Sequence, residues 1–265
     1  MSTQQEANSL NLAISDPVPA LQEPESPLVT LQRGVIDPDT GEWQVDAEVR
    51  EMNGGDEEYL ATIESKGNIT YAEYMAALLK RAVVRIGSCV VSDSPAILDT
   101  ITIGDRDILF LGVIKATYGS SKKFQAVCPN CNKSNDVVMS LIDDFPIQEP
   151  NVNLRSTITQ TLKNGKVVRL RLPNTGDSIH VGKNSTLSAV QNTLMLSRCA
   201  VWDESDRPAN AEEWAKSLNV ADRSMLVNAL LSVEAGPKIE GVNIQCAHCG
   251  GDISVMLDWI SLLLG

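Results

Sequence analysis

Two short cysteine motifs set the architecture of this chain: Cys128-Pro129-Asn130-Cys131 and Cys246-Ala247-His248-Cys249. In each motif a tight turn can bring two sulfurs together, and turn-forming residues follow directly. A single C-x-x-C motif is a weak signal, but a pair of them is typical of a four-thiolate metal site. Zinc fits best, because thiolates bind it tetrahedrally at about 2.3 Å. The sequence therefore predicts one structural zinc held by Cys128, Cys131, Cys246 and Cys249.

The two motifs are unusually far apart, with 114 residues between Cys131 and Cys246. Closing a loop of that length costs about 4 kcal/mol plus a constant, whereas structural zinc releases about 10–16 kcal/mol in small peptides. One ion could thus join two distant parts of the chain, and losing Cys128 or Cys246 is expected to unfold most of it. Two alternatives stay open: two disulfides, or free buried thiols. Cys89 and Cys199 lie in apolar segments predicted to be helical, and we expect them in the core.

Composition and charge narrow the class of protein. Hydrophobic residues make up 43% of the 265, enough for one large domain or two small ones. No apolar stretch has the length of a membrane-spanning helix, and no secretory leader pattern opens the sequence. We therefore expect no membrane association and a reducing cytoplasm, where cysteines favour metal binding over disulfides.

The negative charge is concentrated near the start of the chain. Residues 1–66 contain 14 acidic and 3 basic residues, which accounts for most of the net charge of −12. Nucleic-acid binding needs a basic face, so we expect no nucleic-acid partner. Residues 1–32 contain four prolines and no Lys or Arg; the first basic residue is Arg33. We predict an extended acidic arm over residues 1–42 that a basic partner surface orders.

Similar patterns recur in the two halves of the sequence, in the same order. Strand patterns at 43–52 and 167–172 each lead into an Asn-x-Gly-Asp turn, whose aspartate (Asp56 or Asp177) is expected to cap a helix. Helices are expected at 57–64, 70–86 and 187–197, with Leu78, Leu79, Val83 and Ile86 on one apolar face.

The parallel continues toward both cysteine motifs. Asp105 and Asp222, at an offset of 117, each open a helix with an apolar face, and short strands flank each C-x-x-C. The expected faces comprise Leu109, Gly112, Val113 and Ala116 in the first helix and Leu226, Ala229, Leu230 and Val233 in the second; the expected outgoing strands are Val137–Leu141 and Ile253–Leu257.

These recurrences predict an α+β fold with an internal duplication. The units would be residues 43–145 and 166–265, with 146–165 as a linker and an added strand. The two halves would pair about a pseudo-twofold axis near the metal, with short sheets around it and helices outside. The apolar run 257–264 is expected either to dock on a neighbouring protein or to pack on its own domain.

No catalytic constellation is visible in the sequence. A closed four-cysteine site leaves no open coordination position, and His248 is expected to be an exposed turn residue. Phosphate-binding, dinucleotide-binding, serine-hydrolase and zinc-deaminase motifs are absent. Arg106 and Arg223 are expected to form intramolecular salt bridges rather than to hold a substrate. We therefore predict a non-enzymatic protein.

The order of these motifs resembles the baseplate hub and tail-assembly proteins of contractile-tailed, T-even-like bacteriophages, of the zinc-ribbon type. The resemblance covers about residues 43–265. The matching features are the strand and turn from Val168 to Asp177, the Gly-Asp-Arg helix from Gly104 to Tyr118, Cys-Pro-Asn-Cys with its outgoing strand, and the final Cys-Ala-His-Cys-Gly-Gly with the helix after it.

The resemblance implies a virion or assembly protein near the tail hub. Its partners would be other baseplate, hub or tape-measure proteins in a multi-copy assembly. Its location would be the tail baseplate, and the host cytoplasm during assembly. Two functions stay open: a structural part of the hub or wedge region, or an assembly chaperone absent from the finished particle. A zinc-ribbon regulator that binds nucleic acid is a weaker alternative, because the chain is acidic.

Overall fold

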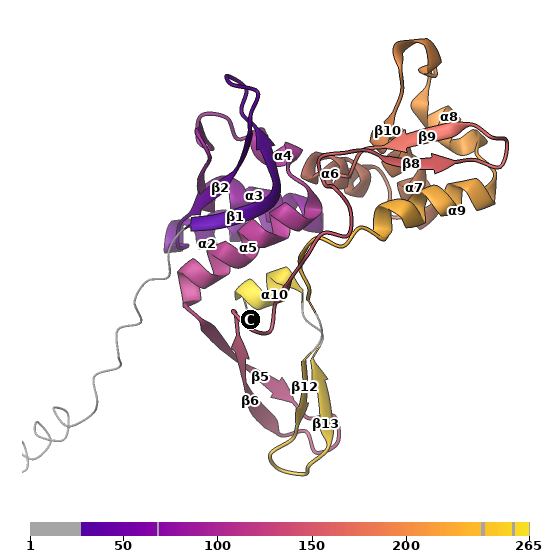
Figure 1. Ribbon diagram of the computed structural model, residues 1–265. Helices are drawn as coiled ribbons and strands as arrows, with labels where there is room; N and C mark the ends of the chain where they lie inside the picture. Colours follow the sequence, from indigo (N-terminus) through magenta and orange to yellow (C-terminus); the bar gives the residue numbers. More distant parts are fainter. Residues whose placement is uncertain (1–27, 68, 240–241, 256–257, 265) are drawn as a thin grey trace, which may run out of the picture.

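The computed structural model describes residues 28–67, 69–239, 242–255 and 258–264, and these form three lobes (Figure 1). The first lobe comprises residues 28–118 together with the helix α10 near the end of the chain. The second lobe comprises residues 158–231. The knuckle lobe comprises two hairpins, 121–140 and 242–255, so it is assembled from distant parts of the sequence. Helices and strands are both abundant, which confirms the α+β class.

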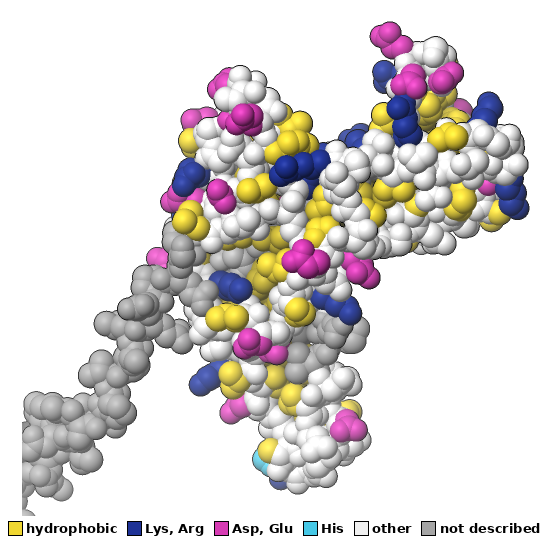
Figure 2. Space-filling view, viewed as in Figure 1, with side chains coloured by type: hydrophobic (Ala, Val, Ile, Leu, Met, Phe, Trp, Pro, Cys, Tyr) yellow, Lys and Arg dark blue, Asp and Glu magenta, His cyan; other side chains and the backbone are white. Residues whose placement is uncertain are grey.

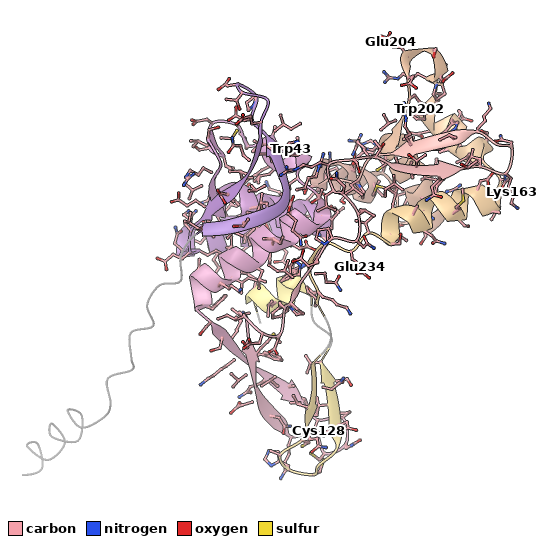
Figure 3. The ribbon with its side chains drawn as sticks, viewed as in Figure 1. Trp43, Cys128, Lys163, Trp202, Glu204 and Glu234 are labelled. Carbon is pink, nitrogen blue, oxygen red and sulfur yellow. The ribbon has the colours of Figure 1, made fainter. Side chains whose placement is uncertain are left out.

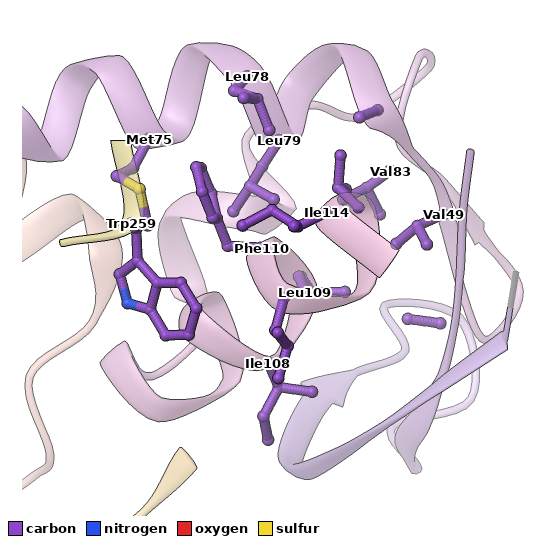
Figure 4. Packing of buried hydrophobic residues seen from close by; sticks show 14 of the residues in the cluster. Val49, Met75, Leu78, Leu79, Val83, Ile108, Leu109, Phe110, Ile114 and Trp259 are labelled. Carbon is purple, nitrogen blue, oxygen red and sulfur yellow. The ribbon is translucent and has the colours of Figure 1, made fainter. Parts of the chain in front are cut away.

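The first lobe is an antiparallel sheet covered by helices. Its strand order is β1-β2-β3-β4. The strands are β1 Leu28–Ile36, β2 Trp43–Val49, β3 Val83–Ile86 and β4 Cys89–Val90; the helices are α2 Gly54–Glu64, α3 Tyr71–Ala82, α4 Ile97–Thr100 and α5 Ile103–Tyr118. The helix α5 packs on β1 and β2, and its side chains fill the centre of the core (Figure 4). This core is the largest of the three in the described residues.

A bulge in β1 fastens this strand to α5. The register of β1 against β2 shifts between Thr30 and Val35. Within the shift, the backbone N–H groups of Gln32, Arg33 and Gly34 all donate to the buried Asp105 carboxylate, with donor–acceptor distances of 2.7–3.3 Å. Gly34 has φ of 76°, and a Cβ there would lie 2.0 Å from the Gln44 carbonyl oxygen. Only glycine therefore fits this bulge.

The second lobe also combines an antiparallel sheet with helices. Its sheet has the antiparallel order β10-β9-β8. The strands are β8 Ile158–Thr161, β9 Val167–Leu170 and β10 Ala200–Val201; the helices are α6 Thr175–Asn184, α7 Ser188–Cys199, α8 Ala211–Ser217 and α9 Val220–Leu231, with a short 3₁₀ turn η1 at Glu204–Asp206. The core includes Leu170, Leu196 and Leu226, and Trp202 packs edge-on against Trp214 with ring centroids 5.1 Å apart.

Two antiparallel segments of chain join the second lobe to the knuckle lobe. Short strands β7 Ile147–Gln148 and β11 Gly236–Pro237 pair where the chain passes between lobes. The hairpin strands are β5 Ser121–Val127, β6 Ser134–Ser140, β12 Val242–Gln245 and β13 Asp252–Val255. They converge on their turns at the far end of the lobe (Figure 1).

The helix α10, Trp259–Leu264, returns the chain to the first lobe. Trp259 is 3% exposed and its ring lies 5.9 Å from Phe110 and 5.8 Å from Phe145. The buried ammonium of Lys122 donates to the Leu262 and Leu263 carbonyl oxygens, at 2.6 and 2.7 Å. Of the two expectations for this apolar run, the intramolecular one is correct for the described residues, and docking of Trp259 on a neighbour is not.

The sequence-based prediction was wrong in several places. Residues 83–86 form strand β3 rather than the end of a helix, so Val83 and Ile86 do not share a helical face with Leu78 and Leu79. Cys89 lies in strand β4 and is only half-buried, whereas Cys199 ends α7 and is buried as expected. The helix α9 ends before Val233.

The acidic arm predicted over residues 1–42 extends too far along the chain, because its last part is folded. Residues 28–36 form β1 with Leu31 and Val35 buried, and the turn 37–42 joins it to β2. The rest of the predicted arm, residues 1–27, lies outside the described residues. The segment 146–165 was expected to be a linker with an added strand; it contains β8, which pairs with β9 and so belongs to the second lobe.

Among the described residues, no helix is both long enough and apolar enough to cross a membrane.

Candidate metal centre

Each cysteine motif forms the same turn at the tip of a hairpin. In the first hairpin the Cys128 N–H donates to the Lys133 carbonyl at 2.9 Å, and the Asn132 N–H donates to the Cys128 carbonyl at 2.9 Å. The second hairpin repeats both bonds, from Cys246 to Gly251 at 2.8 Å and from Gly250 to Cys246 at 2.9 Å. The residue after each second cysteine adopts positive φ, 57° at Asn132 and 71° at Gly250. Asparagine and glycine tolerate this conformation best.

The two turns bring all four sulfurs together, as the sequence predicted for Cys128, Cys131, Cys246 and Cys249. Their Sγ atoms lie within 4.8 Å of one another. Cys128 and Cys249 are 3.7 Å apart, and Cys131 and Cys246 are 3.6 Å apart. A disulfide needs about 2.05 Å, so the sulfurs are not disulfide-bonded. For a tetrahedral ion with metal–sulfur bonds of 2.3 Å, the sulfur–sulfur edge is about 3.8 Å, which fits the arrangement observed.

Hydrogen bonds favour a thiolate at Cys246, whereas the neighbouring sulfurs disfavour one at Cys249. Cys128 and Cys246 are buried, Cys131 is half-buried and Cys249 is exposed. Burial works against ionisation of Cys246, but the backbone N–H groups of His248 and Cys249 and the Asn135 side chain lower its pKa to about 6. For Cys249, the Gly251 N–H favours the thiolate, yet the sulfurs of Cys131 and Cys128 outweigh it and raise its pKa to about 12. A divalent cation would remove this conflict, because it binds every thiolate at once.

Asn135 links the two hairpins beside the sulfurs, and sequence reasoning missed it. Its buried side chain donates to the Lys133 carbonyl at 3.0 Å and accepts from the Ala247 N–H at 2.9 Å. No motif marks this residue, since the contact spans 112 positions along the chain. It fixes the second cysteine turn relative to the first, a role typical of groups that orient metal ligands.

The other candidate residues make contacts that serve the fold. His248 is exposed at the turn of the second hairpin, where its backbone N–H donates to the Cys246 Sγ at 3.4 Å. Arg106 forms the expected salt bridge, to Asp107 at 2.7 Å. Arg223 has no salt bridge to any residue that the structure describes: it donates to the Ala189 carbonyl and to the Thr193 hydroxyl, so the predicted salt bridge is wrong.

Asp56 and Asp177 cap helices, as predicted, and both also bind two arginines. In each capping box the asparagine side chain accepts from the aspartate N–H while the carboxylate accepts from the asparagine N–H. Arg50 and Arg81 contact Asp56, and the matching contacts to Asp177 come from Arg171 and Arg198. The first arginine of each pair precedes its aspartate by six positions. The longer pattern Arg-x-x-Asn-x-Gly-Asp therefore indicates the arginine–aspartate ion pair, which the Asn-x-Gly-Asp turn alone does not.

A family model described as T4 bacteriophage base plate protein matches residues 38–261. The matched range includes all four cysteines of the cluster. No curated protein and no solved structure matches the chain.

Proposed function

The chain belongs to the family of T4 bacteriophage base plate proteins, and from this premise we propose that it is a non-enzymatic structural component of the tail baseplate, in its hub or wedge region. The family match over residues 38–261 is the observation that carries this proposal. Baseplate membership implies association with other tail components. The hub, wedge or tape-measure proteins are the candidates for direct contact, in a multi-copy assembly.

A structural zinc in the knuckle lobe is part of the same proposal. The support for it is the fit of four sulfurs to a tetrahedral ion and the absence of any open coordination position in a four-thiolate site. A closed site supplies folding energy rather than catalysis, which agrees with a non-enzymatic role.

Metal analysis of the purified, reduced chain tests the zinc directly. We expect one equivalent of zinc per chain, and loss of that zinc from Cys128→Ser and Cys246→Ser. Cys89→Ser is the matched control, because Cys89 lies in β4 of the first lobe outside the cluster, and it should keep the metal. Well under one equivalent of metal in the reduced wild type would refute the site, and one equivalent of iron would refute zinc as its occupant.

Quantitative mass spectrometry of purified tails tests the structural role. Stoichiometric recovery of the chain from finished particles is the expected result. Its absence from particles, with presence in assembly intermediates, would instead support a chaperone in the host cytoplasm.

We also propose that residues 28–141 and 158–255 arose by internal duplication, a revision of the boundaries 43–145 and 166–265. Support comes from equivalent contacts at equivalent places: the two capping boxes with their arginine pairs, and the two cysteine turns. Asp105 and Asp222 support it further. Each accepts from the backbone of its lobe's hairpin, at Gly34 and at Lys163 respectively. An experimental structure in which the two units fail to superpose in topology would refute this proposal.

A further inference from the structure

Two arginines lie on one indole ring at the junction of the first and second lobes. The guanidinium carbon of Arg33, on β1, is 5.2 Å from the centroid of Trp43, and that of Arg155 is 4.9 Å from it. The Arg155 Nε also donates to the Arg33 carbonyl oxygen at 3.2 Å. Trp43 stands on the side of the first lobe that faces the second (Figure 3), and Lys and Arg side chains gather at this junction (Figure 2). We call the surface formed by Arg33, Trp43 and Arg155 the arginine notch.

Neither guanidinium has an ion-pair partner within the described part of the chain. The Arg33 Nη1 makes one long bond, 3.5 Å, to the Thr100 carbonyl oxygen, and its buried Nε has no acceptor. The nearby Asp105 carboxylate is occupied by three backbone N–H groups. Burial lowers the pKa of Arg33, Asp105 opposes this, and Arg171 and Arg155 lower it further by repulsion. Positive charge is therefore left over at this notch.

The chemistry of the arginine notch selects for carboxylates. An arginine fork matches a carboxylate in bidentate geometry, and an aromatic wall beside it excludes water. A long polyphosphate is disfavoured, because the chain carries a net charge of −12 and the notch offers only two guanidiniums free of ion pairs in the described residues. We propose that the arginine notch binds the carboxylates of an acidic protein segment. This binding site is separate from the metal centre, and the proposal does not depend on the zinc proposed there.

A defined acidic segment makes the proposal testable. Residues 1–27 contain four acidic side chains and no Lys or Arg, so a fluorescent peptide of this sequence is the probe. The receptor is the full chain with those four side chains neutralised (Glu6→Gln, Asp16→Asn, Glu23→Gln, Glu25→Gln), which removes competition from its own copy. Fluorescence anisotropy then measures binding at low and high salt.

We expect the peptide to bind, and to bind more weakly as salt screens the charges. Arg33→Gln and Arg155→Gln should each weaken binding about tenfold, the loss of one charge-assisted contact. Arg207→Gln is the matched control, because it removes an equal charge from an exposed site in the second lobe and should leave affinity unchanged. Arg155 is exposed, so its variant stays informative even if Arg33→Gln perturbs the sheet.

Four results would overturn the proposal. One is no detectable binding of the acidic peptide at millimolar concentration. Another is equal binding by a peptide whose carboxylates are replaced by amides. The third is an equal effect of Arg155→Gln and Arg207→Gln. A single-stranded oligonucleotide that binds the notch in place of the peptide would also refute the assignment to an acidic protein segment.

Discussion

Replacing Asp177 by Asn should destabilise the second lobe strongly, because this carboxylate joins three of its elements. It accepts from both terminal nitrogens of Arg171 at 2.6 and 3.0 Å, from the Arg198 Nε at 2.7 Å, and from the Asn174 N–H at 3.0 Å. Arg171 follows β9, Asn174 caps α6 and Arg198 lies in α7. The carboxylate has no solvent exposure, whereas the two arginine side chains are 35% and 38% exposed.

These exposures set the size of the effect. Removing one partner of a buried ion pair costs about 3–5 kcal/mol, mostly because a charge is stranded without a partner. Here the stranded charges are arginines that reach water, so the cost should lie at the low end, about 3 kcal/mol. Asn keeps the side-chain volume and one acceptor oxygen of Asp, so this variant tests the loss of the charge without a change in packing. Asp206→Asn, at an exposed site in the same lobe, should change stability by less than about 0.5 kcal/mol.

Hydrogen exchange at α6, α7 and β9 along a urea series is the suitable assay, because a chain with several cores need not unfold in one step. Burial alone would raise the pKa of Asp177, but Arg171 and the Asn174 N–H outweigh burial and hold it below 3.8. The stabilisation by this carboxylate is thus complete above the unfolded pKa and is lost as pH falls through the folded one.

The difference between wild type and Asp177→Asn should therefore be constant from about pH 6 to 8 and shrink below about pH 4. A difference under about 1 kcal/mol at pH 7, or one that persists undiminished in acid, would show that this ion-pair network does not stabilise the lobe as argued.

Three further changes test other parts of the fold by urea or thermal unfolding. Gly34→Ala should cost about 3 kcal/mol or more, because its Cβ would strike backbone at positive φ, whereas Gly41→Ala, with similar φ but open space, should cost about 1 kcal/mol; equal costs would argue against the bulge. Trp259→Ala should cost about 3–5 kcal/mol, since the ring is buried in the first core; a near-neutral effect would mean that α10 is not docked there. Deleting residues 1–32 should lower the melting temperature, because the deletion removes half of β1; an unchanged melting temperature would restore the longer arm.

The sequence predicted best those features whose cause lies within a few residues. The capping boxes at Asn53 and Asn174 and the two cysteine turns depend on contacts between residues three to five positions apart. Such contacts join residues that are close in the sequence, so they can be predicted without knowledge of the rest of the fold. The four-cysteine cluster could be predicted for the same reason, as two local pairs of sulfurs.

Features decided by distant pairing were predicted poorly. Apolar residues at 78, 79, 83 and 86 fit a helical period, yet residues 83–86 are rich in β-branched side chains and pair with β2, which makes them a strand. The prediction missed β1 because it relied on the acidic composition of the first residues and ignored a turn signal after them. The sequence Asp37-Pro38-Asp39-Thr40-Gly41 is a turn between two strands, and the Asp37 carboxylate accepts from the Asp39 and Thr40 N–H groups.

The position of the metal centre could not be predicted either. The sequence suggested a metal between two paired halves, with helices outside. The structure instead places the four cysteines near the far tip of a lobe made only of strands, away from the two helical lobes (Figure 3, where Cys128 is labelled). Residue spacing gives the length of the connections, but not where two hairpins meet.

Because the cysteines lie at the tip of a separate lobe, loss of the proposed metal should affect only part of the molecule. The knuckle lobe has a small core of Ala126, Cys128, Val137, Cys246 and Ile253, two of which are the proposed ligands. Isolated two-stranded hairpins are marginal in water, so we expect this lobe to depend on the proposed metal. The cores of the first and second lobes contain none of the four cysteines. Removal of the metal should therefore open the knuckle lobe alone, rather than most of the chain as the cysteine spacing suggested.

Hydrogen exchange on wild type with and without a zinc chelator separates these two outcomes. We expect β5 and β6 to lose protection in the chelated protein while α5 and α7 keep theirs, because their buried contacts do not involve the sulfurs. Cys246→Ser should reproduce the chelated pattern without added chelator. Simultaneous loss of protection in α5 and α7 would mean that the metal holds the two helical lobes together, and the division of the molecule into independently stable cores would be wrong.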